Sequence, residues 1–149
     1  MVAAAVADAL ALERVLWIPA REPPHKPLGS VTPAPTRLDM VRAATAGDPR
    51  FVVETLELDR PGPSYTVDTV RELRGRMPDA ELFLIVGADQ VRAFDSWRDP
   101  EGIVELVRLA IFDREDTSAE AAEQALPASA QAVLVPVPRV DVSSTEVRA

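Results

Sequence analysis

The sequence of 149 residues contains no cysteine and a single histidine, His25. Without cysteine the chain has no disulfide bond, no thiolate ligand for zinc and no cysteine nucleophile. One imidazole cannot form a multi-histidine metal site, and a Ser-His-Asp triad would have to use His25 itself. The composition therefore excludes several common kinds of catalytic and metal centre.

Basic residues are also in the minority, since 16 Lys and Arg stand against 24 Asp and Glu, a net charge of −8. Nucleic acids and anionic membranes select basic surfaces, so neither is expected as a general partner. A net negative charge still allows the chain to bind a nucleotide in a local basic pocket. No apolar run reaches the roughly 18 residues of a membrane helix, and the first residues lack the basic region of a secretory signal. We expect a cytoplasmic protein with one domain over residues 1–149.

Short apolar runs alternate with segments of helical spacing along the chain. Strands are predicted at 15–18, 51–58, 81–86, 109–112 and 132–137. Helices are predicted at 2–13, from Thr32-Pro33 to Gly47, from Thr66 as N-cap through Leu73, and in two short pieces beside Trp97. The alternation predicts an α/β fold with a parallel sheet and flanking helices. The nearly continuous apolar run at 81–86 is typical of a strand buried on both faces.

Polar side chains gather in five segments that follow predicted strands, where parallel sheets bind their ligands. These are Lys26 beside His25, Thr66 with Thr69, Gly87 with Asp89, Trp97 and Arg98 with Arg114, and Ser143, Ser144 and Arg148. Lysine, helix N-termini and guanidinium groups suit phosphates, an Asp after a strand suits ribose, and an indole beside arginine suits a flat charged heterocycle. Each segment alone also fits an ordinary cap, solvated loop or core residue. Together they predict a nucleotide site and a site for a second phosphate-bearing ligand.

The segments VLWIPAREPPHK, PSYTVDTVRELR, ELFLIVGAD, WRDPE and VSSTEVR occur in this order. In this order they closely resemble the bacterial nicotinate-nucleotide adenylyltransferases of the nucleotidyltransferase superfamily, over about residues 2–148. The resemblance implies a Rossmann-like fold. It implies adenylyl transfer from ATP to nicotinate mononucleotide with Mg²⁺, which yields nicotinate adenine dinucleotide and pyrophosphate in NAD biosynthesis.

The resemblance also implies roles for individual residues, in which Trp97 would stack on the pyridine ring. The nicotinate mononucleotide would be bound by Lys26, Thr66, Thr69, Trp97 and Arg114. ATP would be bound by Gly87, Asp89, Ser143, Ser144 and Arg148.

The chain departs from the family pattern at its start. The family opens with a central strand, a GxFDPxH turn and an HxGH motif whose imidazoles bind the ATP phosphates, and none of these is present in the 149 residues. His25 belongs to a different loop, so no catalytic residue is assigned. The chain also stops before the family's last helix is complete. We expect a truncated version of a longer enzyme, with two unpaired strand edges, poor folding and little turnover.

Two other functions are compatible with this sequence. One is a non-catalytic nucleotide-binding homologue that keeps the pocket without the histidines. The other is a phosphopantetheine adenylyltransferase, whose SSxx[VI][RK]-like ending resembles residues 143–148. The PPHK loop, the SYTVDT segment and Trp97 fit that second enzyme poorly.

Overall fold

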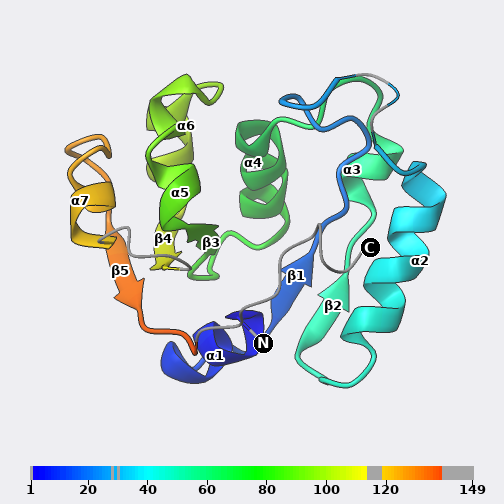
Figure 1. Cartoon of the computed structure of the whole chain (residues 1–149), viewed down its shortest axis with the longest axis horizontal. Helices are drawn as coiled ribbons and strands as arrows, with labels where there is room; N and C mark the ends of the chain where they lie inside the picture. The colour runs from blue at the N-terminus through cyan, green and yellow to red at the C-terminus, as the bar shows by residue number, and fades with distance from the viewer. Residues whose placement is uncertain (1, 28, 30, 114–118, 139–149) are drawn as a thin grey trace.

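The fold is a parallel α/β arrangement in which the strands form two separate sheets (Figure 1). The computed structural model describes residues 2–27, 29, 31–113 and 119–138. One sheet pairs β1 (Val15–Trp17) with β2 (Phe51–Val53), and Val15 lies opposite Phe51. The other has the order β3 (Phe83–Gly87), β4 (Arg108–Phe112), β5 (Ala132–Val135). All pairs are parallel, as predicted from the alternation of strands and helices.

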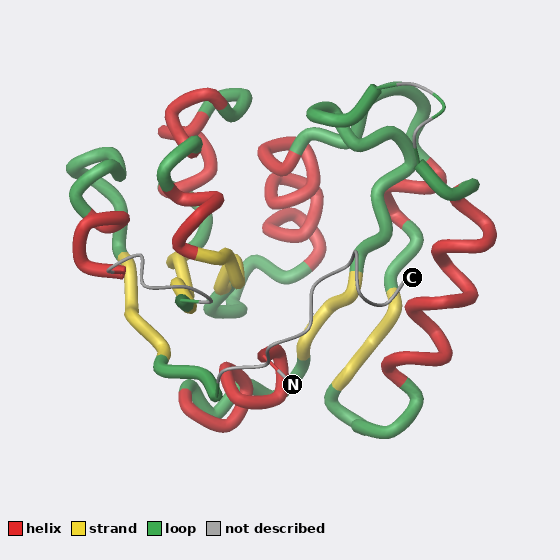
Figure 2. Tube along the Cα trace, viewed as in Figure 1, coloured by secondary structure: helices red, strands yellow, loops and turns green. Residues whose placement is uncertain are grey.

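Helices connect the strands and cover both faces of the larger sheet (Figures 1 and 2). They are α1 (Val2–Ala9), α2 (Ala34–Thr45), α3 (Leu56–Asp59), α4 (Thr66–Arg76), α5 (Ala88–Val91), the 3-10 helix η1 (Phe94–Ser96), α6 (Pro100–Val104) and α7 (Ala119–Glu123). On one face, a core around Phe94, Ile103 and Leu109 packs α4, α5 and α6 against β3 and β4. On the other face, Val6 of α1 packs against Ala110 and Val135. The central strand β4 is therefore almost fully buried.

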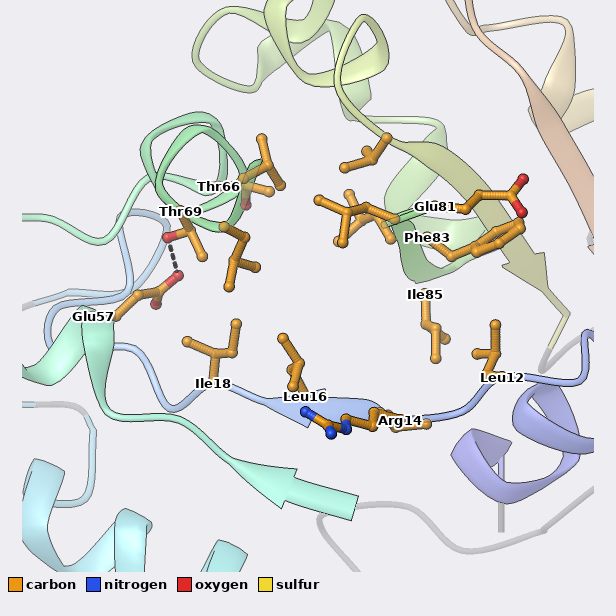
Figure 3. Close-up of a pocket in the computed structure, with 16 residues that line it drawn as sticks. Leu12, Arg14, Leu16, Ile18, Glu57, Thr66, Thr69, Glu81, Phe83 and Ile85 are labelled. Carbon is orange, nitrogen blue, oxygen red and sulfur yellow. Dashed lines mark hydrogen bonds between the residues drawn. The ribbon is translucent and has the colours of Figure 1, made fainter. Parts of the chain in front are cut away.

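The two sheets are separated by a cavity of about 340 Å³ (Figure 3). Residues of both β1 and β3 line it, among them Leu16, Phe83 and Ile85. In the described part of the chain, β1 is hydrogen-bonded only to β2 and β3 only to β4. The sequence-based expectation of two unpaired strand edges is thus met at this cavity.

Helix α1 ends earlier than the predicted range of 2–13, because the chain adopts a left-handed turn at Ala11 (φ 50°). The Leu12 N–H donates to the Ala7 carbonyl (2.9 Å) and the Ala11 N–H to the Asp8 carbonyl (3.4 Å). This pair of bonds is the Schellman motif, which usually has glycine at the left-handed position. Because the sequence has no glycine at this turn, the helix was predicted to continue to residue 13.

We expect Ala11→Gly to stabilise the chain by about 1 kcal/mol, since an L-residue in the left-handed region costs roughly that much. Ala11 is exposed, so the change removes little packing. The free energy of unfolding in urea measures the effect. The matched control, Ala4→Gly inside α1, should lose about 1 kcal/mol because glycine disfavours helix. Equal effects of both variants would contradict this account of the turn.

Other predicted boundaries also need correction. The strand at 51–58 stops at Val53, because the chain turns there into α3 and buries Leu56. Helix α2 is capped by Pro33, and α4 by Tyr65. Neither Thr32 nor Thr66 is therefore the predicted N-cap, because Thr32 precedes the cap position of α2 and Thr66 is the first residue of α4. In contrast, the apolar stripe Val67, Val70 and Leu73 of α4 is buried as predicted.

Candidate functional site

A small cavity of about 120 Å³ lies where the segments after β1, before α4 and after η1 meet. It is lined by Pro24, His25, Ser64, Tyr65, Thr66, Trp97, Arg98 and Ile103. Three of the five polar segments singled out in the sequence therefore come together here, although they lie far apart along the chain. This is the arrangement expected for parallel strands, whose carboxyl ends share one edge of the fold.

The loop that carries His25 is held in place by hydrogen bonds to two other segments. The Arg21 N–H donates to Ser64 Oγ (2.9 Å) and the Ser64 N–H donates to the Glu22 carbonyl (3.0 Å). The Arg37 guanidinium of α2 donates to the Ala20 carbonyl (2.6 Å). These bonds fix the backbone at residues 20–22, directly before the cavity wall at 24–25.

Aromatic rings form another part of the cavity wall. Trp97 is partly buried and packs on the fully buried Phe94, with 5.1 Å between ring centroids and 39° between ring planes. The Arg98 guanidinium lies 4.5 Å from the centroid of the Tyr65 ring. Trp97 is thus both part of the core and part of the cavity wall. A rigid indole beside a guanidinium suits a flat ligand that carries negative charge.

A buried carboxylate, Glu57, lines the larger cavity beside Thr66 and Thr69 of α4 (Figure 3). The Thr69 hydroxyl donates to Glu57 Oε1 (2.6 Å) and accepts from Arg60 Nη2 (2.9 Å). Burial raises the pKa of the Glu57 carboxyl, while the Thr69 hydrogen bond, the Arg60 charge and the Ser64 hydroxyl oppose that shift. Glu57 therefore joins α3, α4 and the segment at 60–64 in one hydrogen-bonded cluster.

Sequence reasoning missed Glu57, because the residue falls inside a stretch predicted as strand. The one available signal was an acid between Leu56 and Leu58 in an otherwise apolar run. The structure also changes the reading of Thr69. Its hydroxyl is hydrogen-bonded to Glu57 and Arg60, and Thr69 lines the larger cavity but not the small one, whereas Thr66 lines both.

The remaining predicted residues lie apart from the small cavity or outside the described residues. Lys26 is exposed on the loop after β1 and is not among the lining residues. Gly87 ends β3, and a Cβ there would lie 2.5 Å from Asp89 Oδ1, so glycine permits the close approach of that carboxylate. Asp89 itself is exposed. Arg114, Ser143, Ser144 and Arg148 lie outside the described residues.

Two searches of the described residues have negative results. No group of three or more His, Asp or Glu in these ranges could hold a metal ion. No helix in the same ranges is long and apolar enough to cross a membrane.

Known proteins resemble this chain over nearly its whole length. The whole chain, residues 1–149, matches the family model described as cytidylyltransferase-like. A Thermus thermophilus protein named probable nicotinate-nucleotide adenylyltransferase is 47% identical, over 95% of this chain and 72% of its own length. A Corynebacterium kroppenstedtii protein of the same name is 42% identical, over 99% of this chain and 69% of its own length.

A solved structure has the same fold at low sequence identity. The Plasmodium falciparum nicotinic acid mononucleotide adenylyltransferase complexed with NaAD superimposes with a TM-score of 0.74 at 18% identity, over 92% of this chain and 68% of that one. Such a likeness carries the fold alone, which is Rossmann-like. Family membership is shown by the family model and by the bacterial relatives. The chain therefore belongs to the cytidylyltransferase-like family, among the bacterial nicotinate-nucleotide adenylyltransferases.

Proposed function

We propose that this chain binds nicotinate mononucleotide in the small cavity and belongs to an enzyme that transfers an adenylyl group to it from ATP. The observation that carries the proposal is the wall formed by Trp97 and by Arg98 over Tyr65. The relatives' names supply the reaction, because both bacterial proteins are named as nicotinate-nucleotide adenylyltransferases.

The nicotinate carboxylate finds a complementary partner at the start of α4. The first backbone bond of this helix runs from the Thr69 N–H to the Tyr65 carbonyl (3.3 Å). The preceding N–H groups of Thr66, Val67 and Asp68 thus have no acceptor within the helix, and the Tyr65 side chain provides no cap. A helix N-terminus of this kind attracts carboxylates and phosphates. With Trp97 stacked on the pyridine ring, the acid group would face these donors.

The other proposed contacts follow the positions expected from the resemblance. Lys26, on the exposed loop, would approach the phosphate of the mononucleotide, with Arg114 supporting the same pocket. Gly87 and Asp89 at the end of β3 would hold the ribose of ATP. The ATP phosphates would be bound by Ser143, Ser144 and Arg148.

Mg²⁺ would enter as the ATP complex, since Mg²⁺ often keeps phosphate and water ligands with few ligands from protein. In the transfer, a phosphate oxygen of nicotinate mononucleotide forms a bond to the α-phosphorus of ATP. The bond between that phosphorus and the oxygen bridging to the β-phosphate breaks, and pyrophosphate leaves. The residues of this chain contribute by holding the acceptor in line, which is the main protein contribution in phosphoryl-type transfers.

Titration calorimetry with nicotinate mononucleotide and, separately, ATP tests the proposal. Trp97→Ala should weaken mononucleotide binding by about tenfold to a hundredfold, because stacking of a base on an aromatic side chain contributes roughly 1–3 kcal/mol. Trp97→Phe should retain most of the affinity. Arg42→Ala, an exposed change on α2, is the matched control and should have no effect.

A pyrophosphate-release assay on the same chain separates binding from catalysis. We expect binding with little turnover, because the single histidine cannot supply the family's HxGH pair. Turnover at a normal enzymatic rate would show that these 149 residues suffice for the chemistry. A folded chain that binds no nicotinate mononucleotide would reject the proposed site.

A further inference from the structure

The small cavity has walls from two separate parts of the chain. Its first wall belongs to the start of α4, with Tyr65 and Thr66. Its second wall belongs to the segment that leaves η1 and enters α6, with Trp97, Arg98 and Ile103. Helices α4 and α6 lie side by side (Figure 1). The shape of the cavity therefore depends on what holds this second segment against α4.

The segment between η1 and α6 turns at Asp99, whose backbone is left-handed (φ 50°, ψ 62°). Apart from Ala11, no other non-glycine residue in the described part of the chain has a positive φ. This conformation is costly for an L-residue, although aspartate tolerates it better than most. Such backbone persists only where its surroundings constrain it. Asp99 is exposed, so the constraint comes from its polar contacts rather than from burial.

Both carboxylate oxygens of Asp99 have partners. Oδ1 accepts from the Gly102 N–H (3.1 Å) and caps α6, while Oδ2 accepts from Arg71 Nη2 of α4 (2.5 Å). Glycine at position 102 leaves room for this cap, because a Cβ there would overlap the Asp99 carboxylate. Arg71 also lies 3.9 Å from the Asp68 carboxylate of its own helix. The Asp99 carboxylate thus ties both the turn and α6 to α4.

The ion pair of Arg71 with Asp99 is not a strong source of stability. The two side chains are 53% and 44% exposed, and exposed pairs are screened by water and salt. Its place in the chain matters more, since Asp99 directly follows Trp97 and Arg98 and begins the helix that carries Ile103. A contact that fixes the chain here pre-forms the cavity wall, and a pre-formed wall binds a ligand more tightly.

We propose that Asp99 is a positioning residue of the small cavity, which holds the wall of Trp97 and Arg98 against α4 through Arg71. Asp99 is not among the lining residues, so it acts through the two residues before it rather than by touching a ligand. The inference rests on the proposed function in one respect, since the ligand of this wall is taken to be nicotinate mononucleotide.

The fluorescence of Trp97 tests the positioning without any ligand. The sequence has two tryptophans, so Trp17→Phe in every sample leaves Trp97 as the only emitter. Asp99→Asn tolerates the left-handed turn and keeps an oxygen for Gly102, but it loses the charge that pairs with Arg71. We expect acrylamide to quench Trp97 about twofold more effectively in Asp99→Asn and in Arg71→Gln, because a wall released from α4 opens more often. Asp99→Ala also loses the cap and should show a larger increase.

Calorimetry with nicotinate mononucleotide tests the consequence for binding in the chain with both tryptophans. Asp99→Asn and Arg71→Gln should each weaken binding by about twofold to fivefold, the range of one exposed ion pair. The double variant should lose no more than either single one, because both remove the same contact. Arg71→Lys keeps the charge and should retain most of the affinity.

Arg76→Gln is the matched control. Arg76 is also on α4, is also 53% exposed and also donates to a carboxylate at 2.5 Å, that of Glu72. It is not among the residues that line the small cavity, so its loss should change neither the quenching nor the affinity.

The two readouts separate this inference from the proposed function. A chain that binds no nicotinate mononucleotide, but whose Asp99 variants expose Trp97, would reject the proposed function and support the positioning role. Unchanged quenching of Trp97 in folded Asp99→Asn and Arg71→Gln would overturn the positioning role. Additive losses of affinity in the double variant, or an equal effect of Arg76→Gln, would overturn it as well.

Discussion

Replacing Phe94 with alanine is expected to lower the free energy of unfolding by about 3–5 kcal/mol, the usual cost of deleting a buried aromatic ring. Phe94 is 0% exposed and belongs to the main core with Val67, Ile103 and Leu109. The loss is large against a typical domain stability of roughly 5–15 kcal/mol. Urea unfolding followed by tryptophan fluorescence measures it.

The same substitution also tests whether the core positions the candidate site. Phe94 supports the Trp97 ring from behind, so Phe94→Ala should weaken nicotinate mononucleotide binding even where the chain is still folded. Phe94→Leu preserves most of the volume and should cost less than about half as much stability. An unchanged affinity in folded Phe94→Ala would show that Trp97 keeps its place without this support.

Thr69→Val is expected to cost about 1–3 kcal/mol at neutral pH, because a buried polar group that loses its partner pays its desolvation cost. Glu57 is 8% exposed and Thr69 5% exposed, so water cannot readily replace the lost hydroxyl. The substitution is nearly isosteric, which keeps the packing of α4 intact. The affected interaction is the 2.6 Å hydrogen bond from Thr69 to Glu57.

The pH dependence of the stability lost in Thr69→Val should show that Glu57 causes the loss. Burial raises the folded-state pKa of Glu57 above its unfolded value, so its stabilising contribution is present below the unfolded pKa and is lost as pH rises through the folded pKa. Thr69→Val removes a bond that lowers this pKa, and its cost should therefore fall as the solution is acidified. Glu57→Gln should abolish this contribution, which urea unfolding at several pH values would reveal. Thr36→Val, an exposed change on α2, is the control, and a pH-independent cost of Thr69→Val would contradict the assignment.

Elements with strong local patterns were predictable from the sequence. Helix α4 follows from the spacing of Val67, Val70 and Leu73, and the core strands follow from their apolar runs. The segment at 51–58 was not predictable, because a short apolar run suits a strand and a helical turn equally well. The shortening of α1 depends on Ala11 in a conformation that usually selects glycine.

The site was predictable where it depends on strand ends and not where it depends on tertiary contact. Trp97, Thr66 and the His25 loop meet because each follows a parallel strand or begins the next helix. The pairing of Glu57 with Thr69 arises only once α3 and α4 pack together. No local pattern marks such a contact, because the two residues are twelve positions apart and belong to different elements.

The division of the strands into two sheets has a consequence for how the chain melts. Hydrogen bonds between strands tie β3, β4 and β5 together, but in the described residues no strand pairing joins them to β1 and β2. A two-stranded pair is marginal by itself, so the half with β1 and β2 relies for its stability on α2, on the Arg21–Ser64 hydrogen bond and on the Glu57–Thr69 hydrogen bond to α4. Heat should open that half first, and the van't Hoff enthalpy should fall below the calorimetric one. The cooperativity of unfolding is thus limited by the lack of strand pairing between the two sheets of the described residues, rather than by the size of the hydrophobic core.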